Sequence, residues 1–184
     1  MIGRLPMSVM VDGREYRIRT DYRDILTIFE AFTDEELSDH EKWSVAVTIF
    51  YEQIPNNLEE AIKQFTWFIN RGEEEKQESR TSKPLYDWEQ DEQMIFQAVN
   101  KVAGKEVREL TYMHWWTFLG LFSEIGESMF SSVVNIRNKK NKGKSLEKHE
   151  REFYRANKAV VDLKKRYSSE QLAEMAELRR VLGI

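Results

Sequence analysis

Residues 111–126 of this 184-residue chain read TYMHWWTFLGLFSEIG. Successive side chains of an α-helix project about 100° apart, so the apolar residues of this stretch point around most of a helix circumference. Such a helix lies either at the centre of a fold or partly beneath another chain. The adjacent Trp115 and Trp116 sharpen this alternative, because both rings are buried only where the helix is enclosed from two sides or where one ring meets a partner. The stretch therefore indicates either the core of a helical protein or an interface, which also favours aromatic anchors.

The chain before this stretch predicts a β-hairpin followed by three helices. Residues 8–11 and 15–19 are strand-like runs that flank Asp12-Gly13, a dipeptide that a two-residue turn favours because it tolerates positive φ. Each of the helices that follow is preceded by a side chain suited to accept a hydrogen bond from the first turn. These capping residues are Asp21, Ser38 with its capping-box partner Glu41, and Asn57 with Glu60.

The region between the third helix and the hydrophobic stretch predicts a loop and one further helix. Residues 73–84 contain no hydrophobic side chain, and a segment that buries nothing cannot offset its ordering entropy, so we expect a flexible loop. A helix is expected to follow Asp87 and to stop at Gly104. Asp87 and Asp91 stand at helical spacing, a pattern more typical of a solvated helix face than of a catalytic carboxylate pair.

The C-terminal region predicts two helices over residues 145–182, either paired with each other or lending a face to an oligomer. Ser168 with Gln171 is a capping pattern for the last of them. The other carries a seven-residue repeat of apolar side chains, at Leu146, Phe153, Val160 and Tyr167. We therefore predict one mainly α domain of about seven helices, with a β-hairpin at 7–19, a helical core at 21–136 and a helical pair at 145–182.

The composition argues against several kinds of site. The absence of cysteine excludes thiol catalysis and iron–sulfur clusters, and it is typical of a reducing cytoplasm. The three histidines are not spaced as a zinc motif requires, no G-x-S-x-G elbow occurs, and Gly143-Lys144-Ser145 lacks the upstream glycine of a phosphate loop. No window is long and apolar enough to span a membrane. The sequence predicts no enzyme, no metal, no cofactor and no membrane partner.

Charge is distributed unevenly along the chain. Residues 137–184 carry 14 basic and 7 acidic side chains, whereas the rest of the chain has a net charge of −11. This asymmetry indicates a charged partner, self-association of unlike halves, or simply a solvated lysine-rich surface. Nucleic acid is the less favoured partner, because no aromatic residue interleaves the basic run and no nucleic-acid-binding fold signature accompanies it. The run contains Arg137, Lys139, Lys140, Lys142, Lys144 and Lys148.

Several segments together resemble the "gp fifteen" family of bacteriophage proteins, found in siphophages and prophages of Gram-positive bacteria. The most specific is MHWWTF at residues 113–118, preceded by DEQMI at 91–95 and followed by VNIR at 134–137. TDYR at 20–23, AI at 61–62 and WF at 67–68 are also similar, so the resemblance covers roughly residues 14–165. Genes of this family typically lie between those of the major tail protein and the tape-measure protein.

That gene position implies a tail assembly chaperone, a non-catalytic protein that binds the tape-measure protein in the host bacterial cytoplasm. Tape-measure and other tail assembly proteins are then the expected partners, together with self-association. The alternatives are a structural virion component of tail-completion or connector type, and an accessory protein that binds nucleic acid. The hypothesis names as partner-binding residues Met113, His114, Trp115, Trp116, Phe118, Phe122, Arg137, Lys139, Lys140, Lys142 and Lys144.

Overall fold

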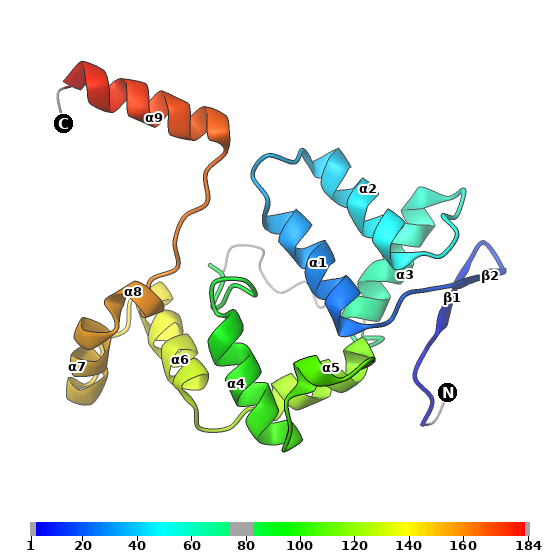
Figure 1. The fold of residues 1–184 in the computed structure, drawn as a ribbon, viewed down its shortest axis with the longest axis horizontal. Coiled ribbons are helices and arrows are strands. Elements are labelled where there is room, and N and C mark those ends of the chain that lie inside the picture. Colours follow the sequence, from blue (N-terminus) through cyan, green and yellow to red (C-terminus); the bar gives the residue numbers. More distant parts are fainter. Residues whose placement is uncertain (1–2, 74–82, 183–184) are drawn as a thin grey trace.

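The computed structural model describes residues 3–73 and 83–182, and in this part the chain is mainly α-helical with an N-terminal antiparallel hairpin, as predicted (Figure 1). The predicted loop at 73–84 falls almost wholly on residues 74–82, which lie outside the described part. The elements are β1 (Ser8–Val11), β2 (Arg14–Arg17), α1 (Tyr22–Thr33), α2 (Asp39–Phe50), α3 (Leu58–Ile69), α4 (Glu92–Ala103), the 3₁₀ turn η1 (Val107–Glu109), α5 (Trp115–Ser123), α6 (Met129–Asn141), α7 (Lys148–Ala156), α8 (Lys158–Val161) and α9 (Ser169–Leu182).

The hairpin confirms the two-residue turn. Val11 pairs with Arg14, which leaves Asp12 and Gly13 as the turn, with φ of 48° and 75°. Both positive values suit the primed turns whose twist matches that of the flanking strands. The second strand ends at Arg17, two residues earlier than predicted, because the next residue instead bridges to Tyr51 at the end of α2.

The three predicted N-caps are confirmed. The Asp21 carboxylate accepts from the backbone N–H of the second helical residue at 3.0 Å, and the Asn57 side chain accepts from Glu60 at 3.1 Å. Ser38 and Glu41 form the reciprocal capping box, with the Ser38 N–H donating to the Glu41 carboxylate at 2.9 Å. Each bond satisfies a first-turn group that has no partner within its own helix, so these starts follow from local sequence.

Helix α5 packs one face against both α1 and α4. Its Phe118 is fully buried and stacks on Tyr22 of α1, with ring centroids 4.6 Å apart and planes within 5°. Trp115 is 1 % exposed and meets Phe29 of α1 edge to face. Of the two alternatives for the hydrophobic stretch, the core therefore applies to the inner face of α5, which carries Trp115 and Phe118.

The helix expected after Asp87 begins later than predicted. Asp87 caps a turn instead, its carboxylate accepting from the N–H groups of Glu89 and Gln90 at 3.0 and 2.9 Å, and α4 starts at Glu92. Gly104 ends α4 in the left-handed conformation, as predicted. Asp91, expected on a solvated face, is 2 % exposed, because its carboxylate is turned to a cation inside the fold rather than to the helix end.

The heptad helix expected from Leu146 to Tyr167 does not exist as one element. The chain breaks at Asn157 between α7 and α8, where the Asn157 side-chain amide donates to the Phe153 carbonyl. After Val161, residues 162–168 form no regular structure, and we call them the strap. The repeat fails because the carbonyls of Val160 and Val161, which a continuing helix needs, accept hydrogen bonds from elsewhere in the fold.

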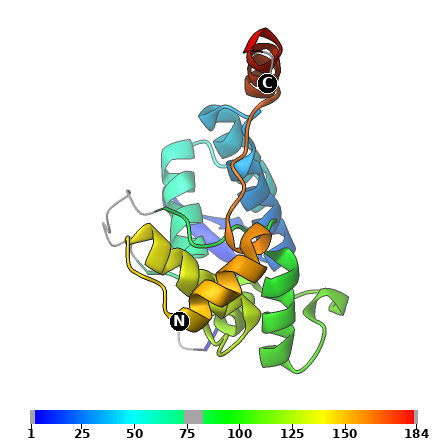
Figure 2. The same cartoon turned by 90° about the vertical axis from the view of Figure 1, so that its left-hand side faces the viewer.

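The last helix is capped by Ser168 and Gln171 as predicted, but it does not pair with the helix before it. Instead, α6, α7 and α8 enclose a small second hydrophobic cluster of Val133, Ile136 and Val161. Helix α9 projects from the body at the end of the strap in both ribbon views (Figures 1 and 2). No helix of the described part is long and apolar enough to cross a membrane.

Candidate functional site

The segment that opens α5 is fastened to the segment that opens α1. The Trp115 N–H donates to the Thr20 carbonyl at 2.7 Å, and the Tyr22 N–H donates to the Met113 carbonyl at 3.0 Å. These two bonds join the linker after the hairpin to the start of the most hydrophobic helix. They explain why Met113 and its neighbours lie inside the fold although they precede α5 itself.

His114 is the N-cap of α5 and is 2 % exposed. Its Nδ1 accepts from the Trp116 N–H at 3.0 Å, which assigns the proton to Nε2, and that nitrogen donates to the Pro6 carbonyl at 2.9 Å. Burial lowers the pKa of His114, and the hydrogen bond to Pro6 opposes this only in part. The imidazole is therefore a neutral structural link between the N-terminal segment and α5.

The two adjacent tryptophans both find partners within the chain. The Trp115 indole N–H donates to the Ile69 carbonyl at 3.2 Å, and the Trp116 indole N–H donates to the Phe68 carbonyl at 2.7 Å. Both carbonyls belong to the last turn of α3, where the regular i+4 backbone donors run out, although the Phe68 carbonyl also accepts from the Arg71 N–H at 3.2 Å. The α3 end thus encloses α5 from the second side that two neighbouring tryptophans require.

The hydrophobic candidates for partner binding therefore divide into two groups. Met113, His114, Trp115 and Phe118 are between 0 and 7 % exposed, so their side chains do not form an accessible surface in this structure. Trp116 and Phe122 are half-buried and lie at the edge of the core. Any contact of this stretch with a partner rests on those two residues and on the outer face of α5.

The outer face of α5 borders a depression of about 470 Å³. Leu119 and Ser123 of α5 line it on one side, and the aromatic rings of Phe29, Tyr86 and Trp88 line it with them. Asn70, Arg71 and Glu73 complete the lining, so the hollow joins aromatic walls to polar ones and suits an amphipathic segment of another protein. We call this hollow the α5 depression.

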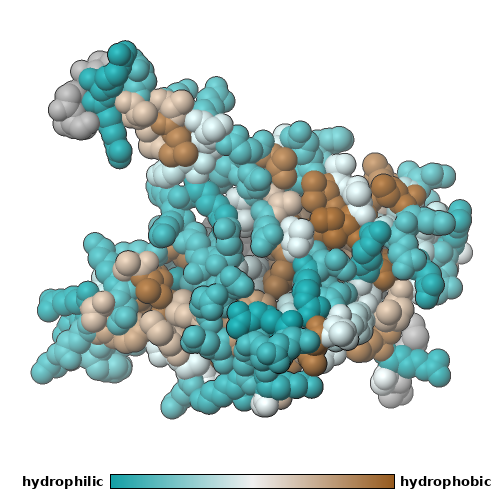
Figure 3. Space-filling model, viewed as in Figure 1, coloured by the Kyte–Doolittle hydropathy of each residue, from teal (hydrophilic) through white to brown (hydrophobic). Residues whose placement is uncertain are grey.

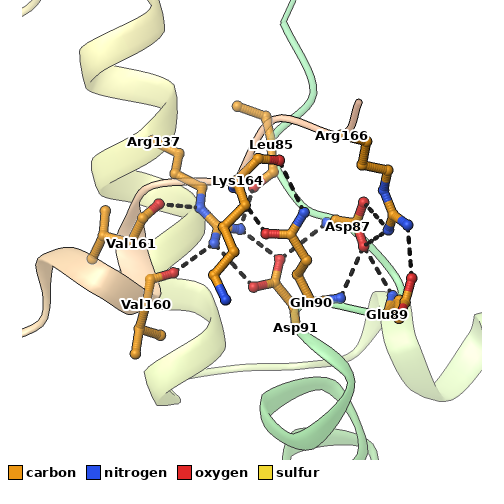
Figure 4. A network of polar contacts seen from close by, with 10 residues as sticks. All are labelled: Leu85, Asp87, Glu89, Gln90, Asp91, Arg137, Val160, Val161, Lys164 and Arg166. Atoms are coloured by element: carbon orange, nitrogen blue, oxygen red, sulfur yellow. Dashed lines mark hydrogen bonds and ion pairs between the residues drawn. The ribbon is translucent and has the colours of Figure 1, made fainter. Parts of the chain in front are cut away.

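The basic candidate Arg137 is buried at the centre of a polar network (Figure 4). Its guanidinium forms two parallel bonds to the Asp91 carboxylate, at 2.5 and 2.9 Å. It also donates to the carbonyls of Val161 at 2.6 Å, Val160 at 2.8 Å and Leu85 at 3.1 Å. All five guanidinium donors are thus used, which is the condition under which a buried arginine is tolerated.

A second set of contacts fastens the strap beside the Arg137 network. The Arg166 guanidinium donates to the Asp87 carboxylate at 2.9 Å and to Glu89 at 2.7 Å. The Gln90 side-chain amide and the Lys164 backbone exchange two bonds, at 2.9 and 3.1 Å. Although burial opposes it, the bonds from Gln90 and Arg166 hold the pKa of Asp87 below its ordinary value. The strap is therefore held by ion pairs and by hydrogen bonds from its backbone to the Gln90 side chain.

The lysines of the basic run also divide between internal and exposed roles. Lys139 binds Glu150 at 2.6 Å, and Lys140 donates to the Tyr154 hydroxyl at 2.8 Å and to Asp162. Although burial opposes it, the Asp162 carboxylate raises the pKa of Lys140. Lys142 and Lys144 are exposed and follow the end of α6. Much of the predicted basic surface is thus neutralised inside the fold.

Two of these findings could not be predicted from the sequence: the ion pair between Asp91 and Arg137, and the interruption of the heptad helix. Asp91 and Arg137 are 46 residues apart, and no local pattern relates them. The heptad repeat pointed to a continuous helix, whereas Arg137 takes the carbonyls that such a helix needs. A single signal was present: both residues stand within the DEQMI and VNIR segments that carry the family resemblance.

The fold and these contacts define a mainly α-helical protein in which buried polar groups are committed to holding the structure. Among the described residues, each buried side-chain nitrogen or oxygen has a partner, and no group of three or more histidine and acidic residues is placed to hold a metal ion. A family model described as Bacteriophage Gp15 protein matches residues 1–163, and the chain belongs to this family. It is thus a bacteriophage structural or morphogenesis protein. No curated protein and no solved structure matches the chain.

Proposed function

We propose that the protein is a tail assembly chaperone that binds the tape-measure protein during tail morphogenesis. The observation that carries the proposal is the family match over residues 1–163, joined to the tail-gene position that the family resemblance implies. The proposed role is non-catalytic and requires only a surface that binds another protein. Binding takes place in the host bacterial cytoplasm, before the tail tube polymerises around the tape-measure protein.

The α5 depression is the surface that we assign to the client. A tape-measure protein exposes long apolar helical stripes before the tube polymerises, and a groove lined by aromatic rings covers such a stripe. The depression is formed by Phe29, Tyr86 and Trp88 against α5, so its walls are held in place by the core beneath. This assignment retains α5 as the partner-binding element but moves the contact from its buried residues to its outer face.

Co-expression with the adjacent tape-measure protein tests the proposal. We expect a soluble complex with several copies of this chain for each client, measured by size-exclusion chromatography with light scattering. Ser123→Arg places a bulky charge in the α5 depression at an exposed position and is expected to reduce client recovery at least about 5-fold, since one important interface contact is worth more than 1 kcal/mol. Thr117→Arg, exposed on the same helix and outside the depression, is the matched control.

A tape-measure protein that stays insoluble in the presence of this chain would contradict the proposal and favour a virion component of tail-completion or connector type. If client is recovered equally by both variants, the chaperone stands but the α5 depression is not its surface. Circular dichroism of each variant establishes that the fold is retained.

A further inference from the structure

We propose that α9 of one copy docks in an acidic-rimmed groove on the body of a second copy, so that copies join head to tail. The inference deepens the self-association included in the proposed function, but it rests on two surfaces of this chain alone. The groove adjoins the α5 depression assigned to the client and shares the side chains of Phe29, Tyr86 and Trp88 with it.

Helix α9 is the first of these surfaces. The hydrogen bonds that the described residues form between α9 and the body both join Ser169 to Glu36, at the first turn of the helix. Leu172 is 53 % exposed and Leu178 is 58 % exposed, and the space-filling view shows hydrophobic side chains on a helix that stands clear of the body (Figure 3). A 14-residue helix is marginal in water without packing against another surface. Helix α9 therefore needs a partner.

The side chains of α9 separate into two faces. At about 100° per residue, Leu172, Met175 and Leu178 fall within one third of the circumference, and Arg179 falls on the same side between the first two. The opposite side carries Glu177, which binds Arg180 at 2.7 Å. The helix therefore presents an apolar face with a cation near its C-terminal end.

The groove is the second surface, and it consists of two adjoining hollows of about 620 and 750 Å³. Its rim carries the exposed carboxylates of Glu30, Asp34 and Glu35, whereas the Glu89 carboxylate there binds Arg166 at 2.7 Å and Lys164 adds a second cation. Its apolar floor comes from the α1 end, the 84–90 segment and the strap, through Phe29, Phe32, Leu37, Leu85, Tyr86, Trp88 and Leu163. An apolar floor with an acidic rim matches an apolar helix face that carries an arginine.

The geometry favours the groove of a second copy over that of the same copy. The strap residues Arg166 and Tyr167 line the groove, and α9 starts two residues later at its edge. The Ser169 bonds to Glu36 hold the first turn there, and from that point the helix runs outward (Figure 1). To enter its own groove, α9 would have to break these contacts and reverse direction within the strap.

Two different surfaces on one chain make a heterologous contact, which propagates from copy to copy instead of closing as a symmetric dimer. Helix α9, which we call the arm, lies beyond residue 163, where the family match ends. An assembly of this form grows along a rod-shaped client.

Two complementary variants test the inference on the full chain. Leu172→Asp with Leu178→Asp disables the arm, and Glu30→Arg with Glu35→Arg disables the groove. Ala173→Asp on the polar side of α9 and Glu124→Arg with Glu127→Arg outside the groove are the matched controls, since all of these positions are exposed. Light scattering over a concentration series measures the mass of each protein alone and of the two disabled variants mixed.

We expect the unaltered chain and the controls to form species whose mass rises with concentration. Each disabled variant is expected to weaken association at least about 30-fold, the loss of a hot spot of 2 kcal/mol, and to stay monomeric where the unaltered chain associates. An equimolar mixture of the disabled variants should form a 1:1 dimer and nothing larger, because one intact arm and one intact groove remain.

An unaltered chain that is still monomeric at roughly 200 μM would overturn the inference, because most specific protein interfaces form below that concentration. So would association that survives in either disabled variant, or a mixture that stays monomeric. None of these outcomes bears on client binding, because the tape-measure protein is absent from the experiment. A monomeric chain that still solubilises its client would refute the arm exchange and leave the proposed function intact.

Discussion

Replacing Arg137 with methionine tests the network that holds the C-terminal region to the body. The Arg137 side chain is 6 % exposed and its partner Asp91 is 1 % exposed. Methionine is a flexible, unbranched side chain that fills much of the space of the arginine stem, so the main effect is the loss of the guanidinium. The buried Asp91 carboxylate then lacks its cation, and the carbonyls of Val160 and Val161 lack their donor.

The expected cost is about 3–5 kcal/mol, which is the effect of removing one partner from a buried ion pair. That loss is a large share of the 5–15 kcal/mol that stabilises a typical domain. For a chain of this length it lowers the melting temperature by roughly 6–20 °C. Because the lost bonds hold Val160 and Val161, the strap should also become accessible to protease before the rest of the fold.

Urea unfolding followed by circular dichroism measures the cost, and limited proteolysis measures release of the strap. Arg155→Met on the exposed surface of α7 is the matched control and should change the stability by less than about 0.5 kcal/mol. Asp91→Asn completes a double-mutant cycle in which the two changes together cost less than their sum. An Arg137→Met protein within 1 kcal/mol of the control would refute the reasoning.

Three further predictions concern the core. Burial lowers the pKa of His114 in the fold, so the unfolded chain binds the proton more readily; stability should fall as pH drops below about 6.5, and His114→Asn should reduce this dependence in urea titrations at pH 5 and 7.5. Tyr51→Phe removes the buried bond to the Ala61 carbonyl at 2.8 Å and should cost about 1–2 kcal/mol in chemical unfolding. Gly72→Ala should lower the melting temperature more than Gly104→Ala, because both have positive φ but only at Gly72 would the new Cβ meet tryptophan rings, at 3.3–3.4 Å; equal shifts would contradict this.

The parts of the fold that depend on neighbouring residues could be predicted from sequence. The Asp12-Gly13 turn and the caps at Asp21, Ser38 and Asn57 each bond within three residues of themselves. Their geometry is therefore written in short patterns whose physics is local. The same holds for the left-handed stop of α4 at Gly104.

The parts that depend on contacts distant in sequence could not be predicted. Periodicity indicated a helix through Val160 and beyond, but Arg137 binds the carbonyls that it needs, from 23 and 24 residues away. The choice between core and interface for Trp115 and Trp116 depended on the end of α3, which supplies carbonyls from more than 40 residues away. Sequence thus identified the important residues of the hydrophobic stretch without fixing what they touch.

The same distinction applies to charge. The excess of basic residues after Arg137 was evident in the sequence, yet Lys139 and Lys140 bind Glu150 and Asp162 within their own subdomain of helices. Composition counts charges but does not show which are neutralised by neighbours. The exposed acidic rim at the α1 end, which no motif marks, became apparent only from the structure.

The most direct test of the central claim is the amount of this protein in mature virions relative to infected-cell lysate, measured by quantitative mass spectrometry against the major tail protein. A tail assembly chaperone is expected in the lysate in complex with the tape-measure protein, and absent from purified particles. A fixed number of copies in every mature particle would contradict the chaperone function and identify a structural component of the tail.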